Sequence, residues 1–274
     1  MVWQVRLEQD LVARLPGGAS HYVTGSGLDA EQRDGWSDLD LHIDLEDSAE
    51  EVIDLLTELD VWAASESEDD GRQVVRLVLV DGRRLDLVVE GGRVEVPVCT
   101  ADNEIRMVAA LAMTKLGRGD RLIGMHLTLE LMRSCLVQAM VLRDRALGTT
   151  VHRSRSDLDE LATEVAALLR DPVDVCVRPN TIERVVELYG RWRQQLEPDY
   201  MPDWSGLRAL LVRGLSGSTA VHAGVGVGES VAGGAGFDDV AVVGESVDDG
   251  GAEAGVGEGL GPAGERFVAG DRDG

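Results

Sequence analysis

The sequence predicts an α+β fold, in which a small mixed β-sheet domain is followed by a helical bundle and a disordered acidic tail. Residues 38–45 alternate acidic or polar with apolar side chains, which is the period-2 pattern of a half-buried strand. From Asn103 onward the apolar residues recur at helical spacing. Beyond residue 214 the chain is rich in Gly, Ala, Val, Ser and acids without any period. These changes in residue pattern and composition predict three domains, at residues 1–98, 99–214 and 215–274.

The first domain begins with an amphipathic pattern over residues 5–15, which predicts a helix that covers the sheet and ends at Pro16. A short strand is expected just before Gly25. Ser48 and Glu51 have the spacing of a capping box, which predicts a helix over residues 49–60. The polar stretch 65–71 is expected to be a loop.

Two further strands complete the predicted sheet. Residues 74–80 and 85–89 are rich in Val and Leu, and Asp81-Gly82 between them is a strong hairpin signal. In the second domain, helices are expected over four ranges: residues 103–118, 121–147, 157–169 and 181–196. Ser156 is the expected N-cap of the third of these helices.

The acidic residues of the strand at 38–45 suggest a metal site. Asp38 and Asp40 point to the same face, with their Cβ atoms about 6 to 7 Å apart. That spacing allows both carboxylates to reach one divalent cation, or a pair of cations. Asp86, flanked by Leu85 and Leu87 on a neighbouring strand, supplies a third carboxylate.

The segment before this strand adds a second motif. Gly25-Ser26 ends a predicted strand, and eleven residues separate Ser26 from Asp38. A strand, a Gly-Ser, a spacer of this length and an Asp-apolar-Asp strand together resemble the nucleotidyltransferase superfamily of DNA polymerase beta. The resemblance implies that Gly25 and Ser26 hold the triphosphate of a nucleotide, and that Asp38, Asp40 and Asp86 hold two Mg²⁺ ions. Family members often carry an Arg soon after the Gly-Ser; here Arg33 is the expected substitute.

The same resemblance implies the reaction and its substrates. A nucleoside monophosphate, expected to be AMP from ATP, would pass to a hydroxyl group, with Asp86 or Glu90 as general base. A helical bundle after the sheet resembles the aminoglycoside and lincosamide adenylyltransferases, so the expected acceptor is a small molecule such as an aminoglycoside-like antibiotic. The alternatives are a nucleotidyltransferase acting on a protein or RNA, as in toxin-antitoxin pairs, and a non-enzymatic nucleotide-sensing module.

One face of the predicted helix 121–147 carries polar residues. His126, Glu130 and Arg133 recur at spacings of four and three. An intrahelical ion pair with a satisfied histidine explains this pattern. The alternative is that His126 and Glu130 line the cleft and contact the acceptor.

The net charge of −24 constrains the partners. Such acidity argues against a standing interaction with nucleic acid or an anionic membrane. It suits either a cationic substrate or a protein from a high-salt cytoplasm. The three cysteines show no metal or disulfide spacing, and no basic leader or long apolar run is present. A cytoplasmic protein is therefore expected, whereas its oligomeric state cannot be inferred.

Overall fold

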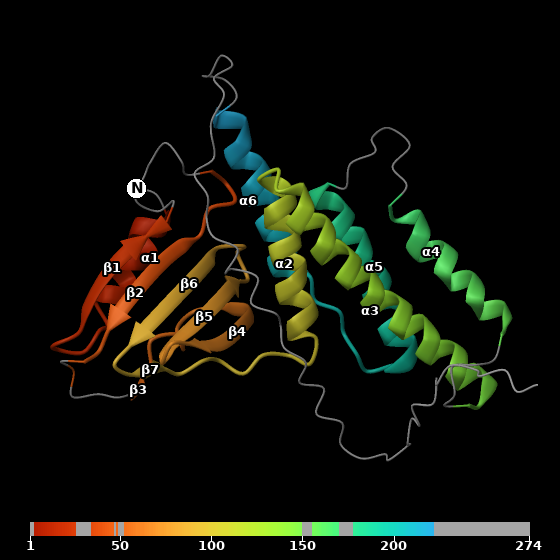
Figure 1. Ribbon diagram of the computed structural model, residues 1–274, viewed down its shortest axis with the longest axis horizontal. Helices are drawn as coiled ribbons and strands as arrows, with labels where there is room; N and C mark the ends of the chain where they lie inside the picture. The colour runs from red at the N-terminus through yellow and green to blue at the C-terminus, as the bar shows by residue number, and fades with distance from the viewer. Residues whose placement is uncertain are drawn as a thin grey trace, which may run out of the picture. The chain divides into compact units, whose positions relative to one another are not determined.

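The computed structural model describes residues 3–25, 34–46, 48, 52–149, 155–169 and 178–221, all within the compact unit Met1–Gly226. These residues form a five-stranded mixed sheet, a separate two-stranded sheet and six α-helices (Figure 1). The expectation of a mixed sheet combined with helices is confirmed. No helix in these ranges combines the length and the apolar character that crossing a membrane requires.

The strands and helices have the following bounds. The strands are β1 (Ser20–Thr24), β2 (Leu39–Asp44), β3 (Val52–Ile53), β4 (Val61–Asp69), β5 (Arg72–Leu79), β6 (Arg84–Glu90) and β7 (Arg93–Val94). The helices are α1 (Trp3–Val12), α2 (Asn103–Gly117), α3 (Arg121–Leu147), α4 (Leu161–Ala167), α5 (Pro179–Leu196) and α6 (Ser205–Val221), and a 3-10 helix, Asp157–Glu160, precedes α4.

The main sheet has the strand order β1-β2-β6-β5-β4. β2 pairs antiparallel with β1 and parallel with β6, and β5 pairs antiparallel with both β6 and β4. The predicted hairpin between β5 and β6 is confirmed: Gly82 has a φ of 79°, and its amide donates to the carbonyl of Leu79.

One face of the sheet is buried beneath α1. The apolar residues of β2, namely Leu39, Leu41 and Ile43, are at most 1% exposed and join Leu7 and Leu11 of α1 in one hydrophobic cluster. The alternation read from the sequence and the covering helix are both confirmed. The side chains between these apolar residues therefore occupy the opposite face.

The helices pack on one end of that opposite face. Val78 and Ala63 from the sheet lie in the same cluster as Trp36, Trp62 and the apolar residues of α2, α3, α5 and α6. The side chain of Asn103, the first residue of α2, donates to the carbonyl of Ala64 and accepts from its amide at 2.6 and 2.9 Å. Helix α2 is thus attached to the edge strand β4, and the rest of this face extends beyond the helices.

The four helices expected after Asn103 are found, and Ser156 caps the third of them as predicted. α6 was not predicted. It includes residue 215, at which the tail was expected to begin, and continues to Val221. Residues 222–274 lie outside the described part of the chain.

The helix expected over residues 49–60 is wrong for the residues that are described. Val52 and Ile53 form the strand β3, which pairs parallel with β7, and Asp54 then accepts a hydrogen bond from the amide of Thr57. A carboxylate that accepts a hydrogen bond from the amide three residues later offers the backbone an alternative to helical hydrogen bonds. Pairing with β7, which is distant in sequence, therefore outweighs the local helical pattern.

The loop expected over residues 65–71 is also wrong. These residues belong to β4, which pairs with β5 as far as Asp69 opposite Arg72, and only Asp70 and Gly71 form the turn. The acids of this edge strand meet arginines, because Glu66 accepts from Arg93 at 2.6 Å and Asp69 pairs with Arg72 at 3.2 Å. These ion pairs let a polar sequence form a strand at the sheet edge.

Candidate metal centre

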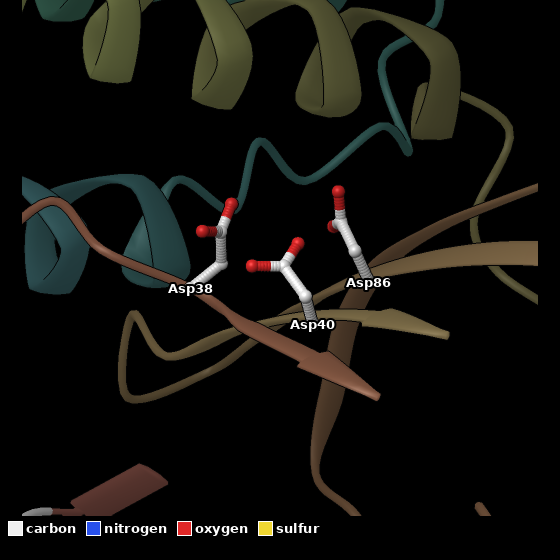
Figure 2. A group of neighbouring side chains, drawn as sticks. All are labelled: Asp38, Asp40 and Asp86. Atoms are coloured by element: carbon white, nitrogen blue, oxygen red, sulfur yellow. The ribbon is translucent and has the colours of Figure 1, made fainter. Parts of the chain in front are cut away.

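Three aspartate side chains meet on the partly open face of the sheet. One carboxylate oxygen from each of Asp38, Asp40 and Asp86 lies within 4.8 Å of the others. Figure 2 shows the three carboxylates on the same side of the sheet, with Asp86 on β6 and the other two on the chain that forms β2. The grouping predicted from the sequence is therefore present.

The parallel pairing of β2 with β6 brings two of these residues together. Asp40 and Asp86 are direct Cα partners in that register, so their side chains lie next to each other across the two strands. Asp38 lies two residues before Asp40 and thus on the same face. A shift of the register by one residue would turn Asp86 to the buried face.

A tight loop fixes the entry into β2. The carboxylate of Asp34 accepts hydrogen bonds from the amide of Trp36 at 2.9 Å and from the hydroxyl of Ser37 at 3.0 Å. Arg118, which follows α2, donates to Asp34 and to the Ser37 hydroxyl, both at 3.3 Å. With Trp36 only 2% exposed, this loop holds the backbone just before Asp38.

Gly25 lies against the centre of the cluster. It follows β1 with a φ of 66°, and a Cβ at this position would collide with the carboxylate of Asp40. Only glycine combines that backbone conformation with such a close approach. The structure therefore places Gly25 beside the acids, whereas the binding of a triphosphate by this glycine stays a prediction.

The charges of the cluster are only partly balanced. Arg84 donates to Asp38 at 2.7 Å, and Arg76 lies 3.6 Å from Asp86. Within the described residues no hydrogen bond or ion pair is found for the carboxylate of Asp40, whose backbone is paired with β1 and β6. Burial, together with the nearby charges of Asp38 and Asp86, raises the pKa of Asp40 to about 7.

These properties fit a divalent cation. Three carboxylates supply the hard oxygen ligands that Mg²⁺ prefers. A cation between them would relieve the repulsion that, after burial, contributes to the raised pKa of Asp40. The two nearby guanidinium groups leave a net charge of −1 among the three acids and two arginines. The arrangement can therefore bind a cation while each outer acid stays anchored to an arginine.

The other predicted site residues are less closely tied to the cluster. Ser26 and Arg33 lie outside the described residues. Glu90 shares the face of Asp86, but it lies four residues further along β6, about 13 Å away, and pairs with Arg72 at 3.5 Å. Of the two predicted general bases, only Asp86 lies at the cluster.

The polar face of α3 does not join the cluster through any contact among the described residues. His126 is exposed and Glu130 is half-buried. The charges that act on Asp40 come from other residues, chiefly Asp38 and Asp86. No ion pair links Glu130 to His126 or Arg133 in this part of the chain, so the role of this face in acceptor binding stays a prediction.

Sequence reasoning missed the arginines of the site. Arg84 and Arg76 share the face of Asp86 by their register, and this follows only once β5 and β6 are paired. The hairpin signal at Asp81-Gly82, combined with strand parity, contained that information.

Comparison of the chain with models of protein families, with curated proteins and with solved structures finds no match.

Proposed function

We propose that this protein is a Mg²⁺-dependent nucleotidyltransferase of the DNA polymerase beta type. It transfers a nucleoside monophosphate, AMP from ATP, to a hydroxyl group of a small molecule. The observation that carries the proposal is the meeting of Asp38, Asp40 and Asp86 on one face, with Gly25 against Asp40. The glycine of the Gly-Ser and the three acids therefore lie together.

In the proposed reaction the acceptor oxygen attacks the α-phosphorus of ATP. The bond between that phosphorus and the pyrophosphate oxygen breaks, and pyrophosphate leaves. Asp86, at the edge of the cluster, accepts the hydroxyl proton. Asp38 and Asp40, with Asp86, would hold the cations, which would stabilise the charge that develops on the entering and leaving oxygens.

The charge of the protein supports a cationic acceptor. The net charge of −24 and the uncompensated acid at the site favour a substrate with amino groups, such as an aminoglycoside-like antibiotic. The free thiols of Cys99 and Cys135 agree with the reducing cytoplasm in which we place the reaction.

A transfer assay tests the proposal. The purified chain is incubated with ATP labelled at the α-phosphate and Mg²⁺, with kanamycin, lincomycin, RNA or cell lysate as acceptor. We expect label on the small molecule, none in the presence of EDTA, and a loss of about a hundredfold or more for Asp38→Asn or Asp86→Asn. Asp60→Asn, which changes an exposed acid outside the site, serves as the control.

The possible outcomes separate the alternatives. Label transferred to protein or RNA would assign the macromolecular alternative in place of the small-molecule acceptor. Binding of ATP with Mg²⁺ but without any transfer would favour the sensing module. Full activity of Asp38→Asn would contradict the metal assignment.

A further inference from the structure

Helix α3 carries apolar side chains on the side that faces away from the hydrophobic core. The helix packs against α2, α4 and α5, and its residues Leu127, Leu131 and Cys135 belong to the buried cluster (Figure 1). Seven other large apolar side chains of α3 are between 36% and 88% exposed. Five of these form what we call the leucine stripe, namely Leu122, Leu129, Leu136, Met140 and Leu147.

The leucine stripe has the spacing of a seam between two helices. Its members follow one another at steps of 7, 7, 4 and 7 residues. At 3.6 residues per turn, all five side chains lie within about 40° of one another around the helix axis. Apolar residues at such heptad spacing form the contact line between two helices that pack side by side. Val137 and Val141, which are also exposed, widen the apolar surface near its middle.

The charge of α3 differs from that of the rest of the protein. The helix contains four arginines and two acids, a balance of +2, in a chain whose net charge is −24. Two copies of a surface rich in carboxylates would repel each other at short range. This helix lacks that excess of acid, so two copies of it can approach closely.

The segments of this chain outside the described residues match the stripe poorly. From Leu122 to Leu147 the stripe extends about 38 Å along the helix. Residues 150–154 and 170–177, which connect neighbouring helices, could reach only about 18 and 28 Å even if fully extended. Residues 222–274 are long enough, but only three of them are Leu, Ile, Met, Phe, Trp or Tyr. They therefore offer too few large apolar side chains to fill the stripe.

We propose that α3 is the surface through which this protein dimerises. The leucine stripe of one copy packs along the leucine stripe of a second copy across a two-fold axis, so each supplies large apolar side chains at the spacing that the other requires. This inference is independent of the proposed nucleotidyl transfer.

The size of the stripe sets the strength of the dimer. A contact about 38 Å long and 10 Å wide covers roughly 400 Å² on each copy. That area is at the low end of specific interfaces between proteins. We therefore expect a dissociation constant in the micromolar range, and an equilibrium between monomer and dimer that changes with protein concentration.

Sedimentation velocity of the full chain, from about 1 to 200 μM at 0.15 M NaCl, tests the proposal. We expect a shift from monomer to dimer across this range. Leu129→Lys and Leu136→Lys should each weaken dimerisation about tenfold or more, because a charge would be buried in the seam. Leu136→Met keeps the apolar surface and should dimerise within about threefold of the unaltered chain.

The matched control is Leu215→Lys, which changes a leucine of α6 that is 55% exposed, close to the 50% of Leu129. It should leave dimerisation unchanged. Since Leu129 and Leu136 are exposed, the lysine variants should keep the melting temperature of the monomer within about 2 °C. That measurement separates loss of the dimer from loss of the fold.

Two results would overturn the proposal. One is a protein that stays monomeric at 200 μM. The other is a dimer that Leu129→Lys and Leu136→Lys leave as strong as before. A monomer that co-sediments with phosphatidylcholine vesicles, and loses this binding in both lysine variants, would assign the stripe to a lipid surface instead.

Discussion

At the scale of single residues, Asp40 shows the conflict between function and stability. It lies between two other acids and against Gly25, and its pKa is raised to about 7 by burial and by its neighbours. Because the folded state binds this proton more tightly than the unfolded chain, the group favours folding less as the pH rises from about 4 to 7. Above pH 7 the metal-free protein carries the whole of this cost.

Replacing Asp40 with Asn tests this conflict. Asp40→Asn should abolish transfer, yet stabilise the metal-free protein at pH 8 by about 1 to 2 kcal/mol, a value discounted for solvent screening. At pH 4 the stabilisation should vanish. Thermal unfolding in EDTA at both pH values measures the effect, and added Mg²⁺ should stabilise only the unaltered protein. A variant that is less stable at pH 8 would show that the carboxylate has a structural role.

At the scale of elements, helix α6 (Ser205–Val221) clamps the loop before β2 and the hairpin between β5 and β6. A Cβ at Gly214 would collide with the ring of Trp36, and a Cβ at Gly35 would collide with the carbonyls of Arg213 and Gly214. On the hairpin, Gly82 comes equally close to the backbone of α6. Glycine permits these approaches, so the geometry of the acids depends on a helix that is distant in sequence.

The clamp predicts an unusual effect of alanine in a helix. Gly214→Ala would normally stabilise α6 by about 1 kcal/mol, but Trp36 is fully buried and cannot move aside. We expect a net destabilisation of about 1 to 3 kcal/mol and weaker Mg²⁺ binding, because the loop that carries Asp38 must shift. Chemical denaturation and metal titration measure the two effects.

Gly17 is the matched control, since its added Cβ would meet no atom within 4 Å. Gly17→Ala should change neither stability nor metal binding appreciably. Equal behaviour of the two variants would mean that α6 does not position the site.

At the scale of the whole molecule, a buried polar network joins the sheet to the helices. Asp102, which is 3% exposed, accepts hydrogen bonds from the hydroxyls of Thr100 and Tyr200, each at 2.7 Å. Arg106 lies 3.4 Å from the same carboxylate and donates to the carbonyl of Trp62 on β4. Burial acts to raise the pKa of Asp102, but these donors and Arg106 outweigh it and lower the pKa.

The network predicts acid sensitivity. Because the folded pKa of Asp102 lies below its ordinary value, its contribution is complete above pH 4 and is lost as the pH falls further. Tyr200→Phe should cost about 1 to 2 kcal/mol at pH 7. It should also move the acid transition to higher pH, which urea midpoints between pH 3 and 7 would show. An unchanged transition would remove Asp102 from the account of acid stability.

The C-terminal segment gives the last prediction at this scale. Ending the chain after Val221 removes a stretch with no apolar period, so the melting temperature and the transfer activity should stay nearly unchanged. Ending it after Arg213 removes Gly214 and the last turns of α6 and should lower both. Calorimetry of the two truncated chains, with the full chain as reference, makes the comparison. A large loss of activity or of melting temperature in the chain that ends after Val221 would show that the residues beyond it are needed.

Much of the site follows from the sequence alone, because its signals are local. The alternation around Asp38 and Asp40 fixes which side chains share a face. The turn at Asp81-Gly82 sets the start of the next strand and so predicts that Asp86 lies on it. Helical periods likewise predicted four of the helices after Asn103, with bounds close to the observed ones. Each of these features depends on neighbours within a few residues. The local preference and the tertiary structure agree at these places, so the sequence alone predicts them.

Only the tertiary structure decided the features that depend on distant partners. β3 replaced a predicted helix because Val52 and Ile53 pair with β7, and the polar residues 65–69 became a strand because β5 and arginines were beside them. The ion pair of Arg84 with Asp38 and the packing of α6 on Trp36 join residues far apart along the chain. Hydrogen bonds and close contacts between such distant segments outweigh local propensities of a few tenths of a kcal/mol per residue.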